Sequence, residues 1–317
     1  MKSKVLITGS SGFIGKNLIN FLKEKKEFSL VTVSRDKPEL VDDTKNHFQV
    51  SSIDSSTDWS NSLKGVDLVI HLAGIAHRSG TNEEYKEINV NGALKLAKQA
   101  LDASVKRLVY VSSIKVNGEQ THSGKIFKAD DLPNPQDSYA KFKYKVETEL
   151  RKISRDTDLE VVIIRPVLVY GPGVKSNLLS LMKWIKKRLP LPLGNANNKR
   201  SFVSIKNLNS FIYICLIHPK AQNETFLVSD QTSISISNLV EKLSLTLTTK
   251  KPLFVPFPKI ILSTFLLLIG RGDIATKLLK SLEVDIEKNS KLLDWKPIQS
   301  TEEGIRQMVE NFLNNEL

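Results

Sequence analysis

Three residues of this chain have the types and spacing needed to move a proton at a carbon–oxygen bond. Tyr139 and Lys143 are four residues apart in a segment of helical periodicity, so both side chains lie on one helix face. An ammonium beside a phenol favours the phenolate, and we expect Lys143 to lower the pKa of Tyr139 from about 10 toward the working pH. Ser113 ends a predicted strand, where its hydroxyl can bind the same substrate oxygen. Ser138 is expected to cap the helix that carries the pair.

A glycine-rich turn near the N-terminus is typical of a loop that binds a dinucleotide. It follows a predicted strand at 4–7 and opens a predicted helix at 14–25. Glycines there permit a tight turn and a close approach to a pyrophosphate, and the helix N-terminus supplies partial positive charge. The spacing is GxxGxxG rather than GxGxxG. The loop residues predicted to bind the cofactor are Gly9, Ser11, Gly12, Phe13, Ile14 and Gly15.

The ends of two later strands are expected to add cofactor contacts. After the fourth strand, Leu72, Ala73 and Gly74 would let a dinucleotide lie close to the backbone. Asp54 follows Ile53 at the end of the third strand, where its carboxylate can accept a hydrogen bond from an adenine amino group. The alternative for Asp54 is a surface residue that caps a turn.

The end of the second strand bears on the choice of dinucleotide. An acidic residue at this position binds both ribose hydroxyls of NAD, but here Ser34 and Arg35 stand roughly twenty residues past the glycine loop. A guanidinium suits a 2′-phosphate, so NADP(H) is favoured over NAD(H). NAD remains the alternative, because a shift of the loop would let Asp36 take the position of the acidic residue.

Apolar runs alternate with helix-length segments of 3.6-residue spacing through the first half of the chain. The predicted strands lie at 4–7, 30–33, 48–53, 68–72, 108–111 and 161–164, and the predicted helices between them at 14–25, 84–103 and 138–153. This alternation predicts an α/β fold with a doubly wound parallel sheet of the Rossmann type. Such sheets bind ligands at the carboxyl ends of their strands. Asn89 and Asn91 are poor helix formers, which indicates side-chain bonding near the active site or a local kink.

The pattern changes after Pro166, and we expect two parts. Residues 1–166 form the NAD(P)-binding domain, and residues 167–317 are mainly a smaller substrate-binding lobe. Strands near 201–206 and 224–229 are expected to rejoin the main sheet. Helices are predicted at 176–187 and at 300–313, the latter opened by a capping box at Ser300.

Composition and charge exclude several classes of protein. The chain has 317 residues, one cysteine (Cys215) and a formal net charge of +12. The absence of a disulfide or signal-peptide pattern favours a cytoplasmic location. The apolar run at 260–269 is about half the length of a membrane span, and the dispersed lysines give no nucleic-acid-binding block. The five histidines have no metal-ligand spacing.

Taken together, the motifs resemble the extended short-chain dehydrogenase/reductase family, of the NAD-dependent epimerase/dehydratase type. The resemblance rests on the glycine loop, Ser113, the Tyr139–Lys143 pair and the segment at 165–173, in the right order. It covers nearly the whole chain and is similar to the branch of UDP-glucose 4-epimerase and UDP-4-keto-sugar reductases. It also allows a homodimer.

The resemblance implies a role for each matching residue. Tyr139 would be the general acid and base, Lys143 would bind the nicotinamide ribose, and Ser113 would polarise the reacting oxygen. Ser112 and Pro166 would contact the cofactor. The residues expected to bind the nucleotide diphosphate of a UDP-sugar are Asn177, Arg200 and Arg271.

The segment after Ser113 narrows the expected reaction. Dehydratases of this family have an Asp-Glu pair there, whereas this chain has Ile114 and Lys115, so dehydration is not expected. The segment at 112–119 resembles the branch of UDP-4-keto-sugar reductases, and this resemblance favours a 4-keto-sugar reductase of bacterial polysaccharide precursor synthesis, acting on a UDP-sugar in its 4-keto form. The alternatives are a UDP-sugar 4-epimerase with tightly bound NAD and, at lower weight, a non-catalytic cofactor-binding protein.

Overall fold

A seven-stranded sheet runs through the centre of the molecule, and all its neighbouring strands are parallel. Its strands are β1 (Ser3–Thr8), β2 (Phe28–Ser34), β3 (His47–Gln49), β4 (Leu68–His71), β5 (Arg107–Val111), β6 (Glu160–Pro166) and β9 (Thr225–Val228). The order β3-β2-β1-β4-β5-β6-β9 reverses direction at β1, which confirms the predicted doubly wound sheet. This computed structural model describes residues 2–35, 46–75, 81–122, 124–192, 198–255 and 280–315.

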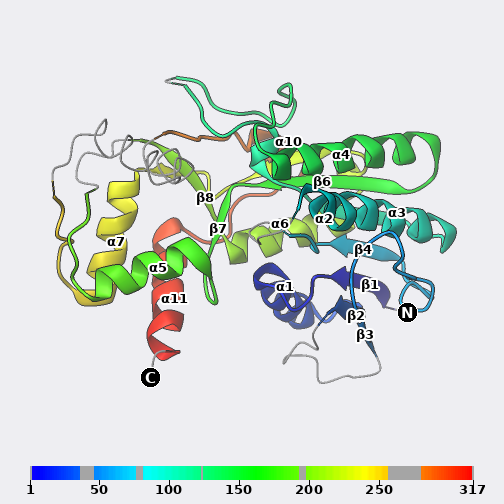
Figure 1. Cartoon of the computed structure of the whole chain (residues 1–317), viewed down its shortest axis with the longest axis horizontal. Helices are drawn as coiled ribbons and strands as arrows, with labels where there is room; N and C mark the ends of the chain where they lie inside the picture. Colours follow the sequence, from blue (N-terminus) through cyan, green and yellow to red (C-terminus); the bar gives the residue numbers. More distant parts are fainter. Residues whose placement is uncertain are drawn as a thin grey trace.

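Helices cover both faces of the sheet (Figure 1). On one face, α1 (Phe13–Lys25) and α6 (Ile205–Ile217) bury residues such as Leu18 and Phe211 against β1 and β4. On the other face, α3 (Ala93–Asp102) and α4 (Ser138–Asp156) bury Leu96 and Val146. Since each fully buried aliphatic or aromatic side chain contributes about 1.5–3 kcal/mol, these two layers hold the strand ends in fixed positions.

The helix predicted at 84–103 is interrupted. It consists of α2 (Asn82–Lys86), a π-helical turn η2 (Glu87–Gly92) and α3. An ideal Cβ on Gly92 would lie 2.6 Å from the carbonyl oxygen of Ile53, so only glycine permits this approach of η2 to the loop after β3. The turn buries Asn89, which lies where the sequence indicated side-chain bonding or a kink.

A second, three-stranded sheet supports the smaller lobe. It contains β7 (Leu168–Tyr170), β8 (Arg200–Ser204) and β10 (Ser233–Ile234), in the order β10-β8-β7. The prediction that a strand near 201–206 rejoins the main sheet is therefore wrong, whereas the one near 224–229 does rejoin it as β9. The edge of the main sheet beside β6 is taken by β9, and β8 pairs with β7 instead.

Three helices pack around the smaller sheet: α5 (Ser176–Lys186), α7 (Ile236–Thr248) and α11 (Thr301–Asn314). They lie together at one side of the molecule in Figure 1. Ser300 caps α11 by accepting a hydrogen bond from the Glu303 amide, as predicted. The chain also returns to the first domain, because α6 packs on α1 and the short helix α10 (Glu287–Leu293) packs on β9.

A short segment at 281–285 joins the two parts. Its backbone bonds β8 through Leu282 and bonds the loop after β5 through Phe127. The loop that follows Ser113 is thereby connected to the strand that carries Arg200.

Candidate active site

The glycine loop has the geometry of a phosphate-binding turn. Gly9 has φ +69°, and an ideal Cβ on Gly15 would lie 2.3 Å from the Gly9 carbonyl oxygen. Gly12 is the exposed N-cap of α1, and among the described residues no side chain caps this end and no acidic residue occupies the first turn. The first amides of α1 and their partial positive charge are therefore left for an anion, which fits the diphosphate of a dinucleotide.

The turn after β4 packs against the glycine loop. An ideal Cβ on Gly9 would lie 2.9 Å from the Ala73 amide nitrogen, so the two turns are in direct contact. A Cβ on Gly74 would lie 2.9 Å from Asn89 Oδ1 and 3.8 Å from Lys143 Nζ. Asn89 accepts a hydrogen bond from the Ile75 amide and donates one to its carbonyl, at 2.8 and 3.0 Å. The predicted side-chain bonding of Asn89 is thus confirmed, and it fixes the backbone beside Lys143.

Tyr139 and Lys143 lie one turn apart on α4, beside the end of β5. The Lys143 side chain is buried, and its ammonium lies 5.9 Å from the centroid of the Tyr139 ring. Lys143 Nζ donates a 2.9 Å hydrogen bond to the Val111 carbonyl. The helix is capped by Asp137, which accepts a 2.7 Å bond from the Ala140 amide, rather than by Ser138 as predicted. Both residues can cap a helix, and the chain uses the one that comes first.

Ser113 is tied to the same helix through Lys115. The Ser113 hydroxyl accepts a 3.3 Å bond from the Lys115 amide at the start of the short 3₁₀ turn η3 (Ile114–Val116). The Lys115 ammonium makes an ion pair with Asp137, the cap of α4, and a second with Glu119 at 3.3 Å. The end of β5 and the start of α4, which carry the three predicted catalytic residues, are therefore held together.

The pKa of Tyr139 differs from the prediction. Burial raises the pKa of this phenol well above its usual range, and the negative charge of Asp137 raises it further. Burial also lowers the pKa of Lys143 to about 8. The prediction that the pKa of Tyr139 lies below its ordinary value is therefore wrong, because desolvation is the larger effect and the Lys143 ammonium donates its hydrogen bond to Val111.

The sequence matches a known family over most of its length. A model of the NAD dependent epimerase/dehydratase family matches residues 5–229. The chain belongs to this family. It is therefore an enzyme of the NAD-dependent epimerase/dehydratase type, in agreement with the resemblance read from the motifs.

Individual relatives agree with this assignment. A UDP-glucose 4-epimerase of Vibrio cholerae is 42% identical over 320 residues, which cover 99% of this chain and 96% of that protein. A dTDP-4-dehydro-6-deoxyglucose reductase of Escherichia coli is 25% identical, with 98% of each chain covered. The solved structure of MoeE5 in complex with UDP-glucose and NAD has the same fold, with a TM-score of 0.80, 21% identity and coverage of 99% and 100%.

A buried ion network behind the epimerase/dehydratase site was not predicted from the sequence. Glu147 is fully buried on α4, four residues after Lys143, and accepts two hydrogen bonds from Arg165, at 2.9 and 2.6 Å. It also accepts a 2.6 Å bond from the Ser112 hydroxyl. Arg165 donates further to Asn117 at 2.9 Å. The Ser112 hydroxyl donates its hydrogen to Glu147, so it could meet the cofactor only as an acceptor, and that contact remains a prediction. The four-residue spacing of Tyr139, Lys143 and Glu147 was the available signal for the network.

Residues predicted to contact the adenosine are less constrained. The Asp54 carboxylate accepts bonds from the Ser56 amide and hydroxyl, at 2.8 and 2.6 Å, and these bonds lower its pKa. This is the turn-capping arrangement, and a contact with adenine remains a prediction. Arg35 is exposed at the end of β2, and Asp36 lies outside the described residues. Pro166, which is also predicted to contact the cofactor, is buried at the end of β6.

The predicted diphosphate-binding residues belong to the smaller lobe. Asn177 is exposed in the first turn of α5. The Arg200 side chain donates a 2.9 Å bond to the Lys280 carbonyl, and burial lowers its pKa to about 10. Arg271 and the apolar run at 260–269 lie outside the described residues. No contact joins Asn177 to Arg200 within the described part of the chain, so a shared diphosphate site remains a prediction.

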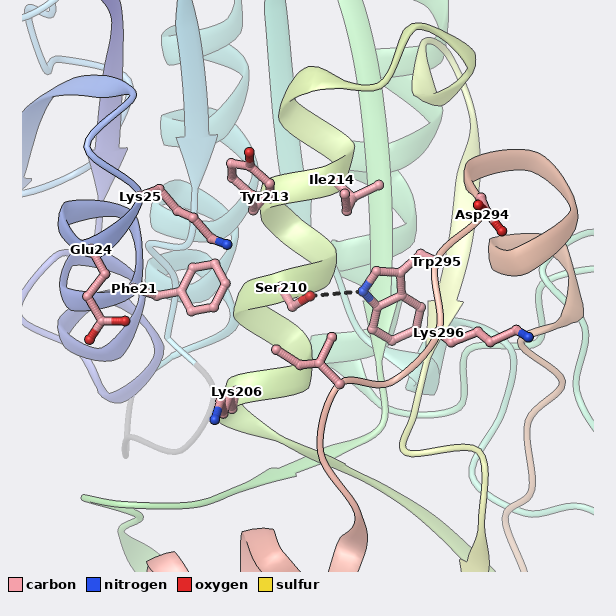
Figure 2. A pocket seen from close by; sticks show the side chains of 11 residues that line it. Phe21, Glu24, Lys25, Lys206, Ser210, Tyr213, Ile214, Asp294, Trp295 and Lys296 are labelled. Carbon is pink, nitrogen blue, oxygen red and sulfur yellow. Dashed lines mark hydrogen bonds between the residues drawn. The ribbon is translucent and has the colours of Figure 1, made fainter.

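A separate surface pocket lies between α1, α6 and residues 294–298 (Figure 2). It has a volume of about 570 Å³ and includes Lys25, Tyr213 and Trp295, whose indole nitrogen donates a 3.1 Å bond to Ser210. None of the predicted site residues lines it. Within the described ranges, no cluster of residues has the composition of a metal site, and no helix is long and apolar enough to cross a membrane.

Proposed function

We propose that this protein is a UDP-sugar 4-epimerase that uses NAD. The observation that carries the proposal is the 42% identity to the UDP-glucose 4-epimerase of Vibrio cholerae, which extends over nearly the full length of both chains. The sequence motifs alone favoured a 4-keto-sugar reductase. The dTDP-4-dehydro-6-deoxyglucose reductase of Escherichia coli is only 25% identical, so we now favour the epimerase over the reductase.

The proposed cofactor is also changed, from NADP to NAD. Support comes from the family description and from the NAD bound to MoeE5, which shares the fold. The preference for NADP(H) rests on Ser34 and Arg35 in place of an acidic residue, and the Arg35 side chain is exposed at the strand end. An exposed guanidinium there is compatible with either dinucleotide.

The residues at the end of β5 and on α4 perform the proton chemistry of this proposal. When bound, NAD supplies the hydride acceptor. Tyr139 removes the proton of the substrate 4-hydroxyl as the C4 carbon is oxidised, and it returns the proton when the resulting ketone is reduced from the opposite face. Ser113 donates a hydrogen bond to the same oxygen, and the charged Lys143 favours the ionised form of Tyr139.

Two neighbouring residues argue against elimination of water as the reaction. Elimination needs an additional acid and base beside the strand-end hydroxyl. Ile114 is buried and cannot transfer protons, and Lys115 is held in ion pairs with Asp137 and Glu119. The remaining groups are sufficient for oxidation and reduction at one carbon.

The test is conversion of UDP-sugars by the purified protein without added cofactor. We expect UDP-glucose or its N-acetylamino analogue to give the C4 epimer, with NAD recovered from the denatured protein and no net change in absorbance at 340 nm. The Tyr139→Phe variant should bind the same NAD and lose turnover. Consumption of NADPH with a UDP-4-keto-sugar, and no epimer formed from either UDP-sugar, would establish the reductase instead.

A further inference from the structure

Tyr110 lies directly beneath the proposed catalytic lysine and has no assigned role. It is 1% exposed in the middle of the sheet, on β5. The Lys143 ammonium lies 4.6 Å from the centroid of its ring, closer than it lies to the Tyr139 ring. A cation within about 6 Å of an aromatic face is attracted by the ring, most strongly where both groups are desolvated.

The hydroxyl of Tyr110 does not explain why a tyrosine stands here. It is buried and has no hydrogen-bond partner among the described residues. A buried polar atom without a partner costs free energy, so the hydroxyl is a liability in this position. The contribution of Tyr110 to the site therefore comes from its ring.

The ring itself is held in place by the neighbouring strand. His71, on β4, stacks on it with ring centroids 5.8 Å apart and planes inclined at 18°. His71 in turn shares a 2.7 Å hydrogen bond with the Thr8 hydroxyl on β1. Burial and the charge of Lys143 lower the pKa of His71 to about 3, so it stays neutral near pH 7 and adds no second cation.

The charged and titratable groups around Lys143 come from three elements. Tyr139 and Glu147 flank it on α4, Tyr110 faces it from β5, and the neutral His71 lies on β4. Among the described residues, Glu147 is the carboxylate that acts on it electrostatically, and that carboxylate is already engaged with Arg165, Arg151 and Ser112. Within the described residues, the aromatic faces and the Val111 carbonyl are the direct partners of the ammonium.

We propose that Tyr110 is a positioning residue of the reaction, whose ring holds the ammonium of Lys143 charged and in place beside Tyr139. The proposal depends on the role of Lys143 in the proposed function but is independent of which sugar is used. Loss of the ring removes an attraction that favours the charged form, so Lys143 should lose its proton more easily. Loss of the ring should also allow the ammonium to move away from Tyr139.

The first test measures Lys143 without any substrate. In protein labelled with ¹³C at lysine Cε, the titration of Lys143 is identified as the resonance missing in Lys143→Met. Replacement of the ring in Tyr110→Leu should increase the acid dissociation constant of Lys143 about tenfold, whereas Tyr110→Phe should leave it within about twofold. Tyr110→Met replaces the leucine variant if that protein does not fold. Equal constants in the aromatic and non-aromatic variants would overturn the proposal even if the protein proved to be a reductase.

The second test separates positioning from loss of core packing. Leu108→Ala is the control, because Leu108 is 1% exposed and belongs to the same core cluster two residues earlier on β5. Tyr110→Leu should lower kcat about 10- to 30-fold and move the alkaline limb of the pH profile to lower pH, with Tyr110→Phe restoring both. Leu108→Ala should lower thermal stability and leave that limb in place. If Leu108→Ala shifts the limb as far as Tyr110→Leu does, Tyr110 is only a core residue.

Discussion

Two buried cations lie near the end of β5, and their surroundings differ. Arg165 is 1% exposed and makes a bidentate ion pair with Glu147, with a further bond to Asn117. Lys143 is 5% exposed, and among the described residues no carboxylate makes an ion pair with it. Its pKa falls to about 8. The comparison indicates that the structural cation is fully neutralised, whereas the cation beside Tyr139 is left with an uncompensated charge that chemistry can use.

The strongest test of this comparison is removal of the uncompensated cation. Lys143→Met should lower turnover by at least about 100-fold, because Tyr139 loses the charge that favours its ionised form. The midpoint of thermal unfolding should stay the same or rise, since an underpaired buried charge disappears. Turnover and calorimetry on the same preparation measure both. A clear fall in the unfolding midpoint would mean that Lys143 is as structural as Arg165.

Removal of the neutralised cation should have the opposite signature. Arg165→Met removes the bidentate partner of the buried Glu147 and leaves it paired with the partly exposed Arg151 at 3.1 Å, and we expect a loss of about 3 kcal/mol in the free energy of unfolding. Urea denaturation measures the loss. The double variant with Glu147→Gln should recover part of it, because the uncompensated charge is then gone. A strictly additive double variant would contradict the pairing.

The pH dependence of stability separates the two cations without catalysis. The pKa of Lys143 is about 8 in the folded protein, below its ordinary value, so between that pH and about 10.5 the unfolded chain binds more protons than the folded one. Lys143 should therefore make stability rise with pH across this window. The rise is read as the difference between the wild type and Lys143→Met in urea midpoints. An identical pH dependence in the two proteins would show that Lys143 is not desolvated.

The smallest effect is expected at the partly exposed ion pairs above the site. Lys115→Ala removes one ion-pair partner of Asp137, whose charge raises the pKa of Tyr139. Stability should fall by less than about 1 kcal/mol, as for other solvent-accessible pairs. Turnover should fall by less than about tenfold, with the reaction shifted to higher pH, and Lys115→Arg should restore it. A loss as large as that of Lys143→Met would place Lys115 in direct contact with the substrate.

The sequence predicted the features that depend on local pattern. The glycine loop, the seven strands of the main sheet and the Tyr139–Lys143 pair follow from spacing and apolar periodicity alone. The pairing of β8 with β7, rather than with the main sheet, could not be predicted, because the pairing of a short strand depends on contacts distant in sequence. Glu147 was missed because a glutamate in a lysine-rich helix has the pattern of a solvent-exposed residue. The raised pKa of Tyr139 depends on burial, which spacing does not reveal.

The segment at 281–285 has a consequence for how this enzyme can be divided. Its backbone bonds both β8 in the smaller lobe and the loop that follows Ser113 in the larger one. The α6 helix and β9 likewise come from the second half of the chain but complete the first domain. No single cut in the sequence therefore releases an intact lobe. A substrate lobe from a relative cannot be exchanged as one contiguous cassette, and a productive chimaera needs several coordinated crossover points.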